Sequence, residues 1–389
     1  MPQDQPMQEA PNKKLSSLPV SFFGACMGLS AMSVAWYAMS NFSLLYSTDS
    51  QHNLTYIPQS SFIISPSFAD RLSLIFALLA IVVFIMLSIA YTIKLITSFE
   101  SCKQEFLSPI TRPFFATICI TLLFLPFTLQ RLEVPEIISF IIWIMGAISM
   151  LIFSVHIVQF WICHKFELSD ITPAWIIPVV GLLDLPLALP LFSQFDVMPD
   201  VGFLISIFCL AVGFAFTILL CTLIFARIVF FAKLPDKLMP TLVILLAPFG
   251  AGVGAYMVFI SMQALTLGEN SLGFLAMDST PYILFLIGLF LFFALLPQII
   301  QIKKCCPFRI SWWAISFPLA AICIANIRIN TEILEFPKSF ALLTSPLLNI
   351  ETIFSFFSTS LLIFTTLVFI WLIVRTLVGL LKGELQNLS

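Results

Sequence analysis

The sequence contains few charged residues. Asp, Glu, Lys and Arg make up only 10% of its 389 residues, whereas 60% are hydrophobic, and the mean hydropathy is +1.07. Soluble domains carry roughly 25% charged residues. This composition excludes a soluble globular protein and predicts a chain that lies in a lipid bilayer.

Several kinds of functional residue are also scarce or missing. The chain has three histidines, no facing pair of histidine ligands for haem, and no Gly-x-x-x-x-Gly-Lys-Ser/Thr phosphate loop. The nine cysteines all fall in predicted spans or cytoplasmic turns, which excludes a disulfide framework. No segment outside the spans is long enough for a catalytic domain. We therefore expect no enzyme, metal, cofactor or nucleic-acid partner.

Long apolar runs are what the sequence has instead. Runs of about 20 residues, the length that crosses ~30 Å of hydrocarbon as a helix, recur along the chain. They predict an all-α integral membrane protein with one transmembrane domain over 19–375, a disordered tail at 1–18 and a short tail at 376–389. The ten predicted spans are 19–40, 71–97, 113–130, 137–163, 173–192, 201–232, 240–262, 281–302, 311–329 and 350–375.

The positive charges predict the orientation of the chain. An even number of spans puts both termini on one side of the membrane. With the N-terminus in the cytoplasm, 14 of the 18 Lys and Arg residues fall on the cytoplasmic side and four outside, in agreement with the positive-inside rule. The sequence therefore predicts a multi-pass protein of the inner (plasma) membrane with both termini cytoplasmic.

Helix-breaking residues are concentrated in the odd-numbered spans. Proline kinks a helix, and freed backbone groups are tolerated at depth only against protein or a water-filled cavity. The pattern predicts five helical hairpins in a quasi-five-fold ring, with odd helices inner, even helices outer and a central path. The alternative is that these residues only assist helix packing. The candidate pore-lining residues are Gly24, Gly28, Pro126, Pro178, Pro248 and Gly250.

Three segments carry a resemblance to a known family. "LPVSFFGACMGLSAMSVAW" (18–36), "RIVFFAKLPDKLMPTLVILLAPFGAGVGAYM" (227–257) and "SWWAISFPLAA" (311–321) resemble the first, seventh and ninth helices of the tellurite-resistance and C4-dicarboxylate transporter family. That family includes bacterial TehA-type proteins and the plant guard-cell slow anion channels. Cys26 and Cys119 stand where related bacterial proteins have proline, so the resemblance does not extend to kinks in the first and third helices.

The resemblance implies a gate. The phenylalanine of the family's Trp-Ala-x-x-Phe-Pro pattern plugs a narrow pore between five inner helices, and the matching residue here is Phe317. Pro318 would fix the backbone that aims the ring at a proline kink, and Gly24 would leave room for it. The resemblance also implies a homotrimer with a pore in each protomer. Without it, Phe317 is one of 42 phenylalanines and simply packs between helices.

Two charged residues within the spans need an explanation. Asp184 lies eleven residues beyond Pro173, about 16 Å along a helix. It is a candidate proton-coupling carboxylate, a cap for a helix that restarts near Pro186, or the partner of a buried cation. Arg328, near the outer end of the ninth span, either concentrates anions in an external vestibule or reaches from the helix end towards water.

These features lead to three functional hypotheses. The first is a gated anion channel or channel-like permease for small inorganic or carboxylate anions, with membrane lipid around it. The second is a proton-coupled carrier for C4-dicarboxylates of the malate type, sulfite or a tellurite-related anion. The third is a non-transporting membrane scaffold or sensor. An apolar, nearly charge-free path predicts that nitrate or iodide passes better than chloride.

Overall fold

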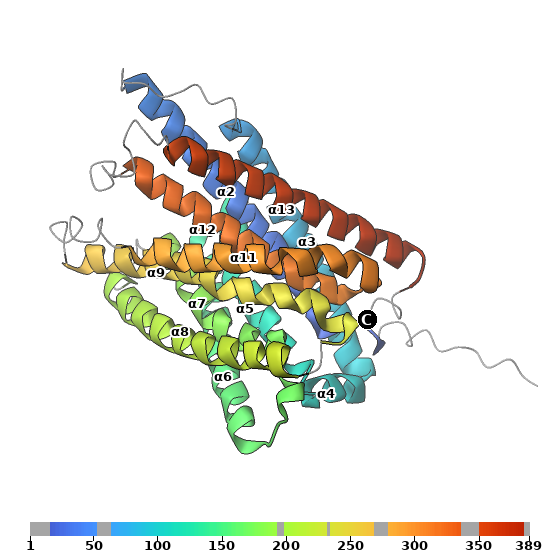
Figure 1. Ribbon diagram of the computed structural model, residues 1–389. Helices are drawn as coiled ribbons and strands as arrows, with labels where there is room; N and C mark the ends of the chain where they lie inside the picture. The colour runs from blue at the N-terminus through green and yellow to red at the C-terminus, as the bar shows by residue number, and fades with distance from the viewer. Residues whose placement is uncertain are drawn as a thin grey trace, which may run out of the picture.

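The computed structural model describes residues 16–52, 64–192, 198–231, 234–267, 279–335 and 350–384. Regular secondary structure in these ranges is helical throughout. Ten of the helical segments are long and apolar enough to cross a membrane, and they pack into one bundle (Figure 1). The chain is thus an all-helical, multi-pass membrane protein, as predicted. Most of the predicted tail at 1–18, and the end of the tail at 376–389, lie outside the described residues.

Five spans are largely buried, and each begins with a 3₁₀ segment that continues as an α-helix. The 3₁₀ helix is tighter than the α-helix and is common at helix N-termini. The five composite spans are η1 (Val20–Phe22) with α2 (Phe23–His52), η2 (Arg112–Phe115) with α5 (Ala116–Arg131), η4 (Pro173–Ile176) with α7 (Ile177–Asp184) and η5 (Leu185–Phe192), η6 (Asp236–Leu246) with α9 (Ala247–Leu267), and η8 (Ile310–Ile315) with α12 (Ser316–Glu335).

The other five spans alternate with these along the chain and are mostly exposed. In their most apolar windows 17–33% of residues are buried, against 67–89% in the composite spans. Along the buried set, α2 contacts α5, α5 contacts α7, α7 contacts α9, α9 contacts α12, and α12 contacts α2. The exposed spans are α3 (Pro66–Thr97), α6 (Glu136–Cys163), α8 (Met198–Phe230), α11 (Thr280–Cys305) and α13 (Ile350–Leu381).

Three of the prolines lie at the 3₁₀–α junctions. Pro178 and Pro248 are the second residues of α7 and α9, and Pro318 is the third residue of α12. A proline in the first helical turn does not interrupt the ladder, because its missing N–H has no partner in the α-helix there. The structure places Pro318 at a change of helix type, and the proline kink at Phe317 stays a prediction. Pro126 does lie inside a helix, α5.

Two glycines allow α12 to lie close against its buried neighbours. A Cβ at Gly28 of α2 would fall 2.1 Å from Ser316 Oγ, and one at Gly250 of α9 would fall 2.6 Å from the carbonyl carbon of Ala321. Small residues at such crossings let helix backbones approach closely in membranes. The helix that carries Phe317 is thus held tightly from two sides.

Polar contacts tie α12 to the exposed helix α13. Trp313 Nε1 donates a hydrogen bond to Thr376 Oγ1 at 3.0 Å, just before α12 begins. About three turns further along α12, Asn326 Nδ2 donates a hydrogen bond to Ser358 Oγ at 2.7 Å. All four side chains are buried. These bonds fix both the depth and the rotation of α12, because each joins a specific pair of positions.

A buried ion pair fastens the start of the first span. The Lys94 side chain is 2% exposed and donates hydrogen bonds to the Leu18 carbonyl at 2.7 Å and to Glu105 Oε2 at 2.6 Å. Glu105 belongs to the short helix α4 (Phe99–Leu107) and also accepts from the Val20 amide at 3.0 Å and the Tyr91 hydroxyl at 3.1 Å. The network joins three segments at the same end of the bundle.

Candidate functional site

Phe317 is held by the residue that precedes it. Phe317 is the second residue of α12 and its side chain is 3% exposed. The Ser316 hydroxyl donates to the Trp313 carbonyl at 2.6 Å and makes a longer contact of 3.4 Å to the Gly24 carbonyl of α2. The backbone that directs the ring is therefore fixed within its own span and against its neighbour.

A second aromatic ring meets Phe317. Phe124 of α5 lies with its ring centroid 5.4 Å from that of Phe317, at an interplanar angle of 85°, and is 2% exposed. This edge-to-face arrangement is one that aromatic pairs prefer. Phe124 could not be identified from the sequence, because nothing in the run "LLFLPF" distinguishes it from the other phenylalanines.

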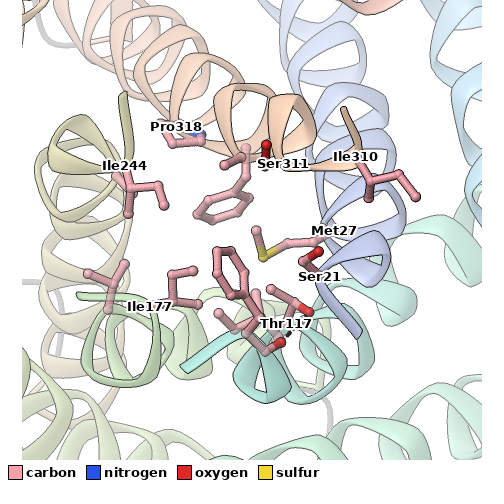
Figure 2. Close-up of a pocket in the computed structure, with 15 residues that line it drawn as sticks. Ser21, Met27, Thr117, Ile177, Ile244, Ile310, Ser311 and Pro318 are labelled. Carbon is pink, nitrogen blue, oxygen red and sulfur yellow. Dashed lines mark hydrogen bonds between the residues drawn. The ribbon is translucent and has the colours of Figure 1, made fainter. Parts of the chain in front are cut away.

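A small cavity lies on one side of the Phe317 ring. This proximal cavity has a volume of about 30 Å³ and an apolar wall to which all five buried spans contribute. In Figure 2, Ser21 and Met27 face Ile177 and Ile244 across the central space, and Pro318 lies beside it. Gly24 also lines the cavity, and a Cβ there would meet nothing within 4 Å.

A second small cavity lies on the other side. This distal cavity also has a volume of about 30 Å³ and again receives residues from all five buried spans, including Val34, Phe127, Asp184, Gly250 and Arg328. Phe317 is the one residue that lines both cavities. Its ring therefore separates two spaces that the same five spans enclose.

The proximal cavity adjoins a wider opening. This mouth has a volume of about 230 Å³ and shares Ser21, Phe114, Ile310 and Ser311 with the proximal cavity. It lies at the N-terminal ends of four of the buried spans. The charged residues that line it are Lys237, Arg309 and Glu105, the last of which is paired with Lys94.

The predicted site residues divide into two groups. Gly24, Phe317 and Pro318 line the proximal cavity, while Gly250, Asp184 and Arg328 line the distal cavity with Phe317. The remaining four lie in the buried spans but are not among the lining residues of these cavities. They are Gly28, Pro126, Pro178 and Pro248.

Asp184 has an unusual environment. It is the last residue of α7, it is fully buried, and neither carboxylate oxygen has a hydrogen-bond partner. The expected capping bond is not formed, and no described cation pairs with it. Within the described ranges, no group of three or more His, Cys, Asp or Glu side chains is arranged to hold a metal ion.

The fold and the cavities define a multi-pass membrane protein whose five buried spans line two small cavities that share the Phe317 ring. The chain belongs to the SLAC1 family, described as voltage-dependent anion channels, whose model matches residues 17–377. The predicted family resemblance is thereby confirmed. Membership of a family of anion channels and transporters also supports, in general terms, a role in anion transport rather than in enzymatic catalysis.

Individual relatives span archaea, plants and bacteria. An uncharacterized transporter of Methanocaldococcus jannaschii is 28% identical over 271 residues, covering 67% of this chain and 75% of that protein. The guard cell S-type anion channel SLAC1 of Arabidopsis thaliana is 23% identical over 355 residues, 90% of this chain and 56% of that channel. A tellurite resistance protein TehA homologue of Haemophilus influenzae is 29% identical over 165 residues, 42% of this chain and 43% of that protein.

Proposed function

We propose that the protein is a gated anion channel or channel-like permease, with a pathway through each protomer that the Phe317 ring occludes. The observation that carries the proposal is the position of this ring between two cavities, each of which receives residues from all five buried spans. The gating role and the identity of the anion are the parts that go beyond family membership.

The proposed path follows the axis of a five-membered ring of helices. The buried spans contact one another in the order α2, α5, α7, α9, α12 and back to α2. Each is followed in sequence by one exposed span. In the proposed arrangement the chain forms five hairpins in a quasi-five-fold ring, with the odd spans inside and the even spans outside. The exposed apolar faces would then contact lipid or, in a homotrimer, a neighbouring copy.

The arrangement corresponds to a closed state. A cavity must offer roughly 10–15 Å³ to hold one water molecule, so each 30 Å³ cavity has room for a few at most. The walls are apolar, so water does not readily fill the cavities. A hydrated ion therefore cannot pass through them. An anion could cross only if the Phe317 ring moved aside.

The mouth is suited to anions. Lys237 and Arg309 contribute two positive charges, while the negative charge of Glu105 is balanced by Lys94 at 2.6 Å. The N-termini of helices add partial positive charge, and four of the buried spans begin here. We place this side, and both termini, in the cytoplasm.

The test is anion flux in liposomes that contain the purified protein. Flux of chloride and nitrate is driven by a potassium gradient with valinomycin and followed with an ion-selective electrode. We expect slow flux in wild type and a rise of at least tenfold in Phe317→Ala. Phe290→Ala is the matched control, because that ring on α11 is 73% exposed. Equal flux in wild type and Phe317→Ala, with equal protein incorporation, would refute the occlusion.

A proton-coupled anion carrier is the second candidate. The observation in its favour is the Asp184 carboxyl, which lines the distal cavity without a hydrogen-bond partner. A carrier of this kind moves malate, or a related anion, only when a proton gradient is present. A membrane potential alone should drive flux through a channel, so the same liposomes separate the two candidates.

A further inference from the structure

Asp184 occupies a place that an acidic residue rarely takes. It is completely buried in a membrane span, and both of its oxygens lack hydrogen-bond partners. It also lines the distal cavity. The distal cavity lies beyond Phe317 as seen from the mouth. An anion that passes the ring would enter the cavity whose wall includes Asp184.

The other groups around Asp184 are apolar, with one exception. The distal cavity receives Val34, Phe124 and Ile324 among other apolar residues, and Arg328 is the one other charged or titratable residue in its wall. Helices α5, α6, α8 and α9 pack against α7. None of the charged or histidine residues of these four helices lines the distal cavity. These residues are Arg131, Glu136, His156, Asp200 and Arg227.

A carboxyl group in such surroundings acts as a hydrogen-bond donor. An ionised carboxylate without a hydrogen bond or a salt-bridge partner is very costly in an apolar interior. Arg328 lines the same cavity but forms no salt bridge with Asp184. The neutral acid avoids that cost and presents one O–H donor together with an acceptor. Within the described structure no protein acceptor takes the donor, and both oxygens are buried in the present arrangement. The donor therefore meets an anion only when the cavity widens around it.

A donor and a cation in one wall complement a particular kind of ligand. A planar oxyanion such as nitrate has several oxygens, so that one can accept a hydrogen bond while the negative charge is attracted to a guanidinium. A halide has no fixed set of acceptor oxygens to match this arrangement. The pairing favours small oxyanions over chloride.

We propose that neutral Asp184 and Arg328 form an anion-binding subsite in the distal cavity that selects small oxyanions, with nitrate as the probe. The inference rests on the proposed anion pathway and adds a specificity site to it. Asp184 donates a hydrogen bond to the passing anion and keeps its proton, so no covalent step is involved.

Two substitutions at Asp184 separate a donor from a charge. Asp184→Asn keeps an uncharged N–H donor in a side chain of similar size. Asp184→Leu removes the donor and puts an apolar side chain in its place. Both are made in the Phe317→Ala background, so that passage of the ring does not limit flux. We expect Asp184→Asn to keep the preference for nitrate over chloride, and Asp184→Leu to lose roughly two- to tenfold of it, the effect of about one hydrogen bond.

A binding measurement that does not depend on flux accompanies this test. Nitrate that binds the folded protein raises its melting temperature in detergent by mass action. We expect nitrate to raise the melting temperature more than chloride does in the Asp184→Asn variant, and no such difference in Asp184→Leu. Variants are compared only after gel filtration shows the same monodisperse particle.

Three outcomes would overturn the inference. If Asp184→Asn raises nitrate and chloride flux by the same large factor, the native residue is an anionic barrier. If Asp184→Asn and Asp184→Leu show the same nitrate preference and the same nitrate stabilisation, the donor has no role, although the pathway stands. If Phe317→Ala and every variant built on it are silent, the proposed function fails, and the inference fails with it.

Discussion

The contact between Phe124 and Phe317 predicts how strongly the ring is held. The two centroids are 5.4 Å apart at 85°, and Phe124 comes from a different span. Replacing Phe124 with alanine leaves Phe317 in place but removes the ring that its edge-to-face contact requires. If Phe317 is the gate, as proposed, the substitution therefore changes the stability of the closed position without removing the occluding group.

The expected effect can be worked out from this geometry. An edge-to-face pair contributes about 0.5–1.5 kcal/mol beyond burial, which corresponds to a roughly 2- to 12-fold rise in the open fraction. Displacing the whole Phe317 ring also forfeits its burial, about 1.5–3 kcal/mol. The sum of about 2–4.5 kcal/mol predicts that Phe317→Ala raises flux roughly 30- to 2,000-fold.

Liposome flux of the two single variants and the double variant tests this reasoning. We expect the order wild type, Phe124→Ala, Phe317→Ala, with the double variant no faster than Phe317→Ala, because Phe124 acts through the other ring. Phe290→Ala again serves as the control for loss of a phenylalanine on the lipid side. Flux through Phe124→Ala that exceeds that of Phe317→Ala would show that Phe124 is the main plug, and would refute the assigned roles.

Further predictions concern stability and selectivity. Glu105→Gln leaves Lys94 buried without its anion, and breaking a buried pair costs about 3–5 kcal/mol, so the melting temperature should fall by several degrees. Glu100→Gln, which removes an exposed pair at 3.6 Å, should change it little, and equal losses in both variants would contradict the role of burial. Gly250→Ala should destabilise by about 1–3 kcal/mol through overpacking, whereas Gly24→Ala, with open space around it, should not; thermal unfolding in detergent compares them. Reversal potentials in bilayers should rank nitrate and iodide above chloride, and a chloride-first order would refute a weakly interacting apolar path.

The number and type of spans were predictable because hydropathy alone encodes them. Ten apolar runs of membrane length correspond to ten candidate membrane spans in the described part of the chain. The effect of the prolines was not predictable in the same way. Proline fixes φ near −65°, which suits both a 3₁₀ and an α-helix, so the sequence did not reveal that Pro178, Pro248 and Pro318 mark a change of helix type.

Individual side-chain roles were harder to predict, because they depend on pairs of distant residues. Phe124 was missed, since its contact with Phe317 joins positions almost two hundred residues apart. For Asp184 the sequence left a cap, an ion pair and a coupling group open, and only the packing of α7 shows the carboxyl without partners in a cavity. Gly24 and Gly28 are one helical turn apart, yet one faces the proximal cavity and the other contacts Ser316.

The 3₁₀ segment Ile310–Ile315 directly before α12 makes that span longer than six α-helical residues would. A 3₁₀ helix rises about 2.0 Å per residue and turns 120°, against 1.5 Å and 100° in an α-helix. If these six residues rewound into α-helical form, the helix after them would move by about 3 Å along its axis and rotate by roughly 120°. The hydrogen bonds from Trp313 to Thr376 and from Asn326 to Ser358 oppose such a movement, so they keep the Phe317 ring at its place between the two cavities.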